Sequence, residues 1–108
     1  MTDSGQPPTP TERRRLEALE ETPHAHLFDA EPQTIRLALA DDERIPAHQH
    51  PDREIVLHVL EGQLTMSLGD GEYDVREGDV VRFDGAQEIS PKAQADTTAL
   101  LVLAQRAD

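Results

Sequence analysis

The stretch of sequence that decides the fold reads His48-Gln49-His50-Pro51-Asp52-Arg53-Glu54, and it runs directly into Ile55-Val56-Leu57-His58-Val59-Leu60-Glu61-Gly62. Residues i and i+2 of a β-strand share a face, so both imidazoles of the His-x-His pair point into one cavity. Two imidazoles on one face can contact the same metal ion at about 2.0–2.2 Å. His48 and His50 are therefore candidate metal ligands.

The rest of the chain also has a strand-like pattern. From Gln33 onward the period is two, with Ile35, Leu37 and Leu39 pointing to one side. Seven or eight short runs separated by Gly, Pro and Asp turns predict an all-β, antiparallel small sandwich or barrel. A parallel α/β fold is excluded because no helical segment separates the predicted strands. The predicted strands after Leu39 are Ile45–His50, Ile55–Glu61, Leu64–Leu68, Glu72–Val75, Val80–Phe83, Glu88–Ser90 and Thr98–Ala104.

The N-terminal region has a different character. Met1–Pro8 is polar and predicts a flexible tail. Thr9-Pro10-Thr11-Glu12 has the pattern of a helix-capping box and predicts a short helix over Pro10–Glu21. Leu16 and Leu19 form a narrow apolar stripe on that helix, which we expect to dock on a sheet or on a partner subunit.

Length and apolar content limit the chain to one small domain. The chain has 108 residues and 24 Leu, Ile, Val and Phe residues, of which only four lie in residues 1–31. We therefore expect a tail, short helix and connection over 1–31, and a barrel over 32–106.

Charge and composition exclude several partners. The net charge is −12, and such a surface repels phosphate backbones and anionic lipid headgroups, so neither nucleic acid nor a membrane is an expected partner. The absence of cysteine excludes disulfides and thiolate metal sites. No leader or membrane segment is recognisable in the sequence, and we expect a cytoplasmic protein.

Two motifs resemble a known family. His48-x-His50-x3-Glu54, closed by Val59-Leu60-Glu61-Gly62, resembles motif one of the cupin superfamily, and Gly78–Gly85 resembles the start of its motif two. The resemblance covers roughly Pro32–Ala104. It implies a six- to eight-stranded jelly-roll barrel, often dimeric, which in many members holds Fe, Mn, Ni or Zn through three His and one carboxylate. It does not specify a reaction.

The carboxylate position of motif one departs from the family pattern. The family spacing, counted back from Gly62, falls on Ile55 instead of Glu54. An unbroken strand would place Glu54 on the histidine face, whereas a bulge at Pro51-Asp52-Arg53 would turn it outward. Because the regular strand Ile55–Leu60 fixes register more firmly, we expect Ile55 to face the cavity.

Motif two departs at its histidine position, where Glu88 stands instead. A carboxylate binds the same metals, so His48, His50 and Glu88 form a candidate two-His-one-carboxylate set suited to Fe(II) with open positions. Three alternatives stay open. Glu88 is a solvated loop residue, or it is buried without metal as a general acid, or the two imidazoles line a polar cavity that holds no metal.

Other polar residues have weaker assignments. His58 faces away from the pair in this register, and His24-Ala25-His26 lies in the connection, where a plain loop is expected. Arg36 and Arg82 either bind a substrate carboxylate at the barrel mouth or pair with surface acids. The barrel walls and core are assigned to Ile35, Leu37, Leu39, Leu57, Val59, Leu64, Leu68, Val81, Phe83, Leu101 and Leu103.

The sequence thus predicts a single-domain cupin, expected to be a homodimer, that binds a small organic ligand in the barrel, with a divalent metal (Fe, Mn, Ni or Zn) at His48 and His50. If it is an enzyme, the resemblance implies a metal-dependent oxygenase or isomerase. The rival hypothesis is a non-catalytic cupin that acts as a ligand sensor or oligomeric scaffold without metal.

Overall fold

The computed structural model describes residues 7–106, so most of the predicted Met1–Pro8 tail lies outside the described residues. The described part contains eight strands and a 3-10 turn, η1 (Leu16–Ala18). The strands are β1 (His24–His26), β2 (Gln33–Leu39), β3 (Arg53–Glu61), β4 (Gln63–Leu68), β5 (Gly71–Arg76), β6 (Val80–Asp84), β7 (Ile89–Ala93) and β8 (Thr97–Gln105).

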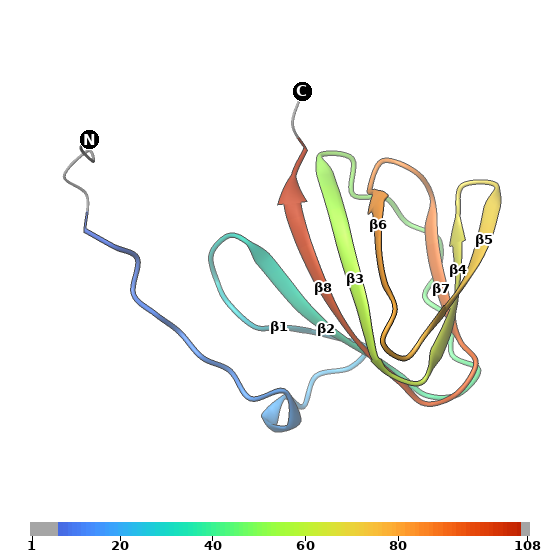
Figure 1. Ribbon diagram of the computed structural model, residues 1–108, viewed down its shortest axis with the longest axis horizontal. Helices are drawn as coiled ribbons and strands as arrows, with labels where there is room; N and C mark the ends of the chain where they lie inside the picture. Colours follow the sequence, from blue (N-terminus) through green and yellow to red (C-terminus); the bar gives the residue numbers. More distant parts are fainter. Residues whose placement is uncertain (1–6, 107–108) are drawn as a thin grey trace.

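The strands form two facing antiparallel sheets (Figure 1). One has the order β1-β2-β8-β3-β6 and the other the order β5-β4-β7. The sheets approach each other at the β3–β4 turn and spread apart toward the opposite end. This arrangement confirms the predicted all-β jelly-roll class, and β1 begins ahead of the boundary expected at residue 32.

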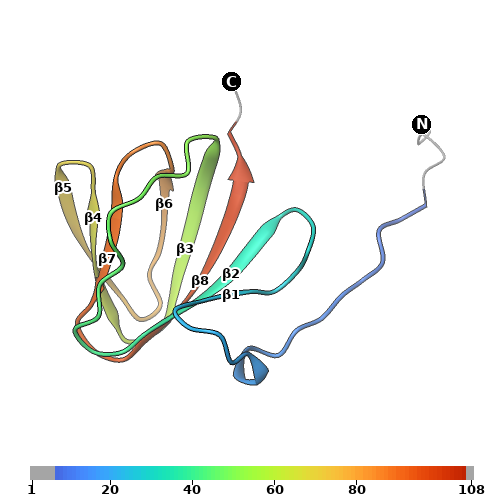
Figure 2. The ribbon, with the colours of Figure 1, turned by 180° about the vertical axis from the view of Figure 1, so that it is seen from behind.

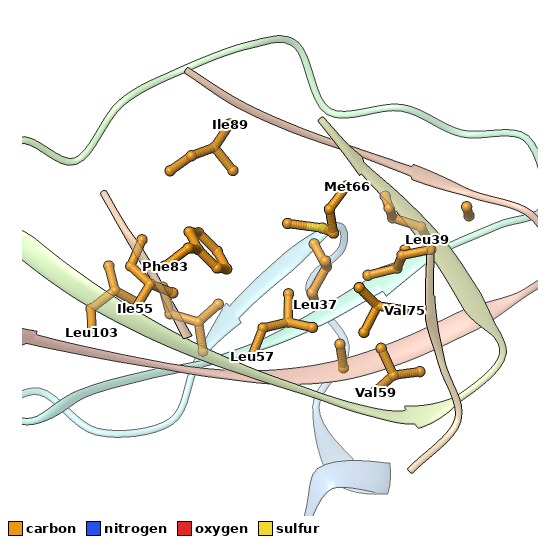
Figure 3. Packing of buried hydrophobic residues seen from close by; sticks show 14 residues of the cluster. Leu37, Leu39, Ile55, Leu57, Val59, Met66, Val75, Phe83, Ile89 and Leu103 are labelled. Atoms are coloured by element: carbon orange, nitrogen blue, oxygen red, sulfur yellow. The ribbon is translucent and has the colours of Figure 1, made fainter. Parts of the chain in front are cut away.

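The core lies between the two sheets and follows the predicted period of two. Leu37, Leu57 and Val59 of the larger sheet are fully buried and face Met66 and Val75 of the smaller one (Figure 3). Each such aliphatic side chain contributes roughly 1.5–3 kcal/mol to folding through burial. All the predicted core residues are buried or pack against the cluster; Ile55, Met66, Val75, Ile89, Ala93 and Ala99 complete it.

The predicted helix over Pro10–Glu21 is wrong: within this range only η1 is helical. Two leucines make too narrow an apolar stripe to stabilise a short helix by packing. In addition, Arg13-Arg14-Arg15 places three like charges side by side within the predicted range, directly before η1. The segment instead runs largely extended, and its exposed part before η1 leads away from the two sheets (Figure 1).

Arg36 explains how this N-terminal segment is attached. Its guanidinium is buried on the outer face of β2 and donates hydrogen bonds to the backbone carbonyls of Glu21 at 2.8 Å and Leu16 at 3.4 Å. Both predicted roles of Arg36, a substrate contact and an ion pair with a surface acid, are therefore wrong. The residue holds the segment against its own sheet.

The predicted strand over Ile45–His50 is also wrong. This segment makes only isolated bridges, at Arg44 with Lys92 and at His48 with Ile89, so it follows the edge of β7 without becoming a continuous strand (Figure 2). Pro46 has no N–H group to donate, which breaks the ladder between the two bridges.

Candidate functional site

A cavity of about 430 Å³, open to solvent on one side, lies between the concave face of the larger sheet and the segment that carries His48 and His50. We call it the histidine cavity. Its lining residues are His24, His26, Gln33, Ile35, Ile45, Pro46, Ala47, His48, His50, Ile55, Phe83, Ile89, Leu101 and Leu103. Most of these side chains are apolar, as in typical small-molecule sites, and the polar ones are mainly imidazoles.

His48 is positioned by its own backbone and by its ring. Its N–H and C=O groups both pair with Ile89, at 3.0 and 2.8 Å, which fixes the residue against β7. The ring atom Nδ1 lies 2.9 Å from the carbonyl oxygen of Pro46. A proton on Nδ1 makes this contact a hydrogen bond, and Nε2 of the neutral ring then carries a lone pair.

His50 is positioned by the loop that follows β6. Its N–H donates to the carbonyl of Gly85 at 2.7 Å, and its own carbonyl accepts from Arg53 N–H at 3.0 Å. A Cβ on Gly85 would collide with the carbonyl oxygen of His50 and would lie 3.1 Å from its Cβ. Only glycine leaves room for His50 at this place, so the motif-two turn determines where the imidazole stands.

The structure brings His48 and His50 together as predicted. Their ring centroids are 5.0 Å apart and the planes are nearly perpendicular, at 88°. Both rings are half-buried and both line the histidine cavity. Partial burial, aided by the neighbouring charges of His48, His24 and Arg53, lowers the pKa of His50 below its ordinary value.

The second His-x-His pair was missed as part of the site. His24 and His26 belong to β1, where they pair with Leu37 and Ile35 of β2 and line the same cavity, while Ala25 between them is buried on the other face. Burial, together with His48 and His26, lowers the pKa of His24. The alternation His-Ala-His was the available signal, because it has the same period of two as a strand with one inward face.

The structure confirms that Ile55 faces the cavity. Its side chain is 1% exposed and lines the cavity beside Phe83, its partner in β6. Glu54 is half-buried and is not a lining residue; it stands opposite Asp84 in the register of β3 with β6. An apolar side chain therefore occupies the position at which the family pattern has its metal-binding carboxylate.

Glu88 lies apart from the histidines. It is exposed, is not a lining residue, and its backbone carbonyl accepts a hydrogen bond from Gly69 N–H at 2.9 Å. Residues 7–106 contain no group of three His, Cys, Asp or Glu side chains arranged to hold a metal ion. With Ile55 in the carboxylate position and Glu88 directed to solvent, the residues present do not fit the three-His-one-carboxylate centre that the resemblance implied.

Arg53 and Glu31 form an ion pair close to the site. Arg53 forms a two-point ion pair with Glu31, at 2.7 and 2.9 Å, and also donates to the carbonyl of Leu103 at 3.0 Å. This clamp joins the β1–β2 connection to β3 and β8, and sequence reasoning missed it because the partners are 22 residues apart. His58 and Arg82 lie outside the cavity, as predicted for His58.

Fold and cavity together define a small jelly-roll protein with a solvent-reaching internal site. The family described as the cupin domain matches residues 36–104, and the chain belongs to this family. No curated protein matches the sequence. Among the described residues, no helical segment has the length and apolarity that crossing a bilayer requires.

Several solved structures share the fold. The TT1209 protein of Thermus thermophilus aligns with a TM-score of 0.71 and 21% identity over 90% of this chain and 100% of its own. A predicted oxalate decarboxylase of Thermotoga maritima aligns with a TM-score of 0.68 and 20% identity over 77% and 79%. The Cnp3 cupin domain of Schizosaccharomyces pombe aligns with a TM-score of 0.70 and 14% identity over 77% of this chain, which spans 60% of that chain. At these identities the likeness shows the fold alone.

Proposed function

We propose that this cupin is a binding protein for a small organic molecule, which it holds in the histidine cavity. The single observation that carries the proposal is a cavity of about 430 Å³ whose apolar walls end in a set of imidazoles. Sites of this volume and lining suit small organic ligands, with the few polar groups fixing orientation. Binding, as in a ligand sensor, is favoured over catalysis because Ile55 replaces the carboxylate of the motif.

The test is a thermal-shift and NMR screen of the full-length protein against a library of small organic acids, alcohols and amides. Compounds that bind are expected to raise the melting temperature and to shift the imidazole resonances of His48 and His50. His48→Ala and His50→Ala should weaken that stabilisation, whereas His58→Ala, a half-buried histidine outside the cavity, is the matched control. A hit that responds equally to all three variants, or no hit at all, would contradict the proposal.

A divalent metal at His48, His50 and Glu88 is the second candidate. It is favoured by the orientation of His48, whose Nδ1 contact with Pro46 resembles the carbonyl support that metal-binding histidines usually have. Glu88 would have to turn in from solvent to complete the set. Elemental analysis after loading with Fe, Mn, Ni or Zn decides this: near-stoichiometric metal that is lost in His48→Ala supports it, and less than about a tenth of an ion per chain rejects it.

A further inference from the structure

The histidine cavity differs in charge from the rest of the chain. The protein has 22 Asp and Glu residues and a net charge of −12. None of the cavity-lining residues is acidic, and their polar side chains are those of Gln33 and four histidines. In a protein so rich in carboxylates, a cavity whose polar groups are imidazoles and one amide has no acidic side chain to repel an anion.

The histidines lie at the solvent-facing end of the cavity. His24 and His26 are exposed and His48 and His50 are half-buried. The buried lining residues are all apolar: Ile35, Ile55, Phe83, Ile89 and Leu103. A ligand held here therefore meets polar groups at one end and hydrocarbon at the other. This division fits an amphipathic molecule with one compact polar head.

The imidazoles are suited to different hydrogen bonds. A neutral imidazole has one N–H donor and one acceptor nitrogen. His48 directs Nδ1 to the carbonyl of Pro46, so its donor is already used. His24 and His50 come from different parts of the chain, β1 and the segment before β3, and both line the same cavity. Their N–H groups remain as donors for a ligand head, together with those of the His26 ring and the Gln33 amide.

We propose that the ligand is a small monocarboxylic acid with an apolar body. Its carboxylate accepts hydrogen bonds from the rings of His24 and His50, and its hydrocarbon part packs on Ile55 and Phe83 inside the cavity. The guanidinium of Arg53, whose charge reaches His50, adds a favourable field for the anion although Glu31 partly neutralises it. This inference rests on the proposed function and narrows it to one ligand class.

The test compares three probes of equal length, hexanoate, 1-hexanol and hexylammonium, by calorimetric titration of the full-length protein at neutral pH. Salt at about 0.15 M screens the surface carboxylates that would otherwise repel the acid and attract the amine. Hydrogen bonds to a charged group predict that hexanoate binds at least about tenfold more tightly than 1-hexanol. Equal affinity for the acid and the alcohol, or tighter binding of the amine, would overturn the assignment.

Two variants locate the preference. His24→Phe keeps an aromatic ring at the cavity edge but removes its donor, so the ratio of the affinity for hexanoate to the affinity for 1-hexanol should fall by at least about threefold. His58→Phe makes the same exchange outside the cavity and should leave the preference unchanged. An unchanged preference in His24→Phe would overturn the role of His24. Circular dichroism shows whether that variant folds. If it does not fold, His24→Gln, which keeps a donor on a smaller side chain, replaces it and must retain the preference.

The outcomes separate this inference from the proposed function. If hexanoate and 1-hexanol bind equally and both shift the imidazole resonances, the cavity is a ligand site but not a carboxylate site, so only the inference fails. If none of the probes, and no compound of the wider library, binds in the cavity, both fail.

Discussion

The rings of His48 and His50 meet edge to face, with centroids 5.0 Å apart, and each residue is held by a different part of motif two. Ile89 pairs with the backbone of His48, and Gly85 receives the N–H of His50. The two halves of the family signature therefore cooperate through the backbone: the second motif supplies no histidine to the cavity but sets the position of both histidines from the first.

The pKa of His50 and that of His24 are lowered, first by burial and then by neighbouring charges, and this predicts a pH effect on stability. The unfolded chain, with imidazoles near the ordinary value of 6.5, takes up protons at pH values where the folded protein does not. The free energy of unfolding should therefore fall as the pH drops below about 6.5. Urea unfolding at several pH values measures it.

The matched variant for this prediction is His50→Gln, which removes one of the two groups and should flatten the pH dependence. An NMR titration of the imidazoles gives an independent check. A midpoint for His50 at or above its ordinary value would contradict the account of its environment.

Gly85→Ala should displace His50. A methyl group there would collide with the carbonyl oxygen of His50 and approach that of Arg53 to 2.9 Å. Overpacking of this kind destabilises by about 1–3 kcal/mol, and we also expect weaker ligand binding because the imidazole moves. Gly71→Ala is the control, since its new methyl meets only the exposed side chain of Tyr73. Equal effects of the two substitutions on binding would argue against positioning by Gly85.

Arg36→Gln should release the N-terminal segment. The shorter side chain cannot reach both Leu16 and Glu21, whose carbonyls now accept from the guanidinium. We expect faster proteolysis within residues 16–22 and a loss of roughly 1–3 kcal/mol of unfolding free energy. Limited proteolysis followed by mass spectrometry locates the cuts. Unchanged protection of this segment would contradict the role assigned to Arg36.

Removal of residues 1–22 tests the expected homodimer. Leu16 and Leu19 are half-buried against the rest of the chain, and we propose that this region also docks on a partner subunit. Light scattering should then show a dimer for the full chain and weaker association after truncation. A truncated protein that dimerises as tightly as the full chain would place the interface elsewhere.

The neighbours Val56 and Leu57 test the register of β3. Leu57 is fully buried, so Leu57→Ala should cost about 2–5 kcal/mol, whereas Val56 is 37% exposed on the outer face and Val56→Ala should cost less than about 1 kcal/mol. Chemical unfolding measures both. A larger loss of unfolding free energy from Val56→Ala than from Leu57→Ala would mean that Val56, and not Leu57, faces the core.

Local alternation was enough to predict most of the fold. The strands from Ile55 to Phe83 and the final strand carry apolar residues at every second position, and the structure places them close to the predicted bounds. The segment over Ile45–His50 also alternates, but Pro46 breaks its pairing, so pattern alone overstated it. The helix over Pro10–Glu21 failed because a capping signal cannot replace a packing surface.

The site was only partly predictable. His48, His50 and Ile55 belong to one stretch whose register could be argued from spacing, and the structure places them at one cavity. His24 reaches the same cavity through the pairing of β1 with β2, and Arg53 finds Glu31 across the fold. These contacts depend on tertiary arrangement, which spacing along the chain does not encode.

The most direct test of the central claim is a crystal structure of the protein grown with a ligand from the binding screen. We predict electron density for the ligand inside the histidine cavity, with its polar end within hydrogen-bond distance of an imidazole and its apolar part against Ile55 and Phe83. A ligand bound elsewhere on the molecule, or His48 and His50 turned out into bulk water, would contradict it.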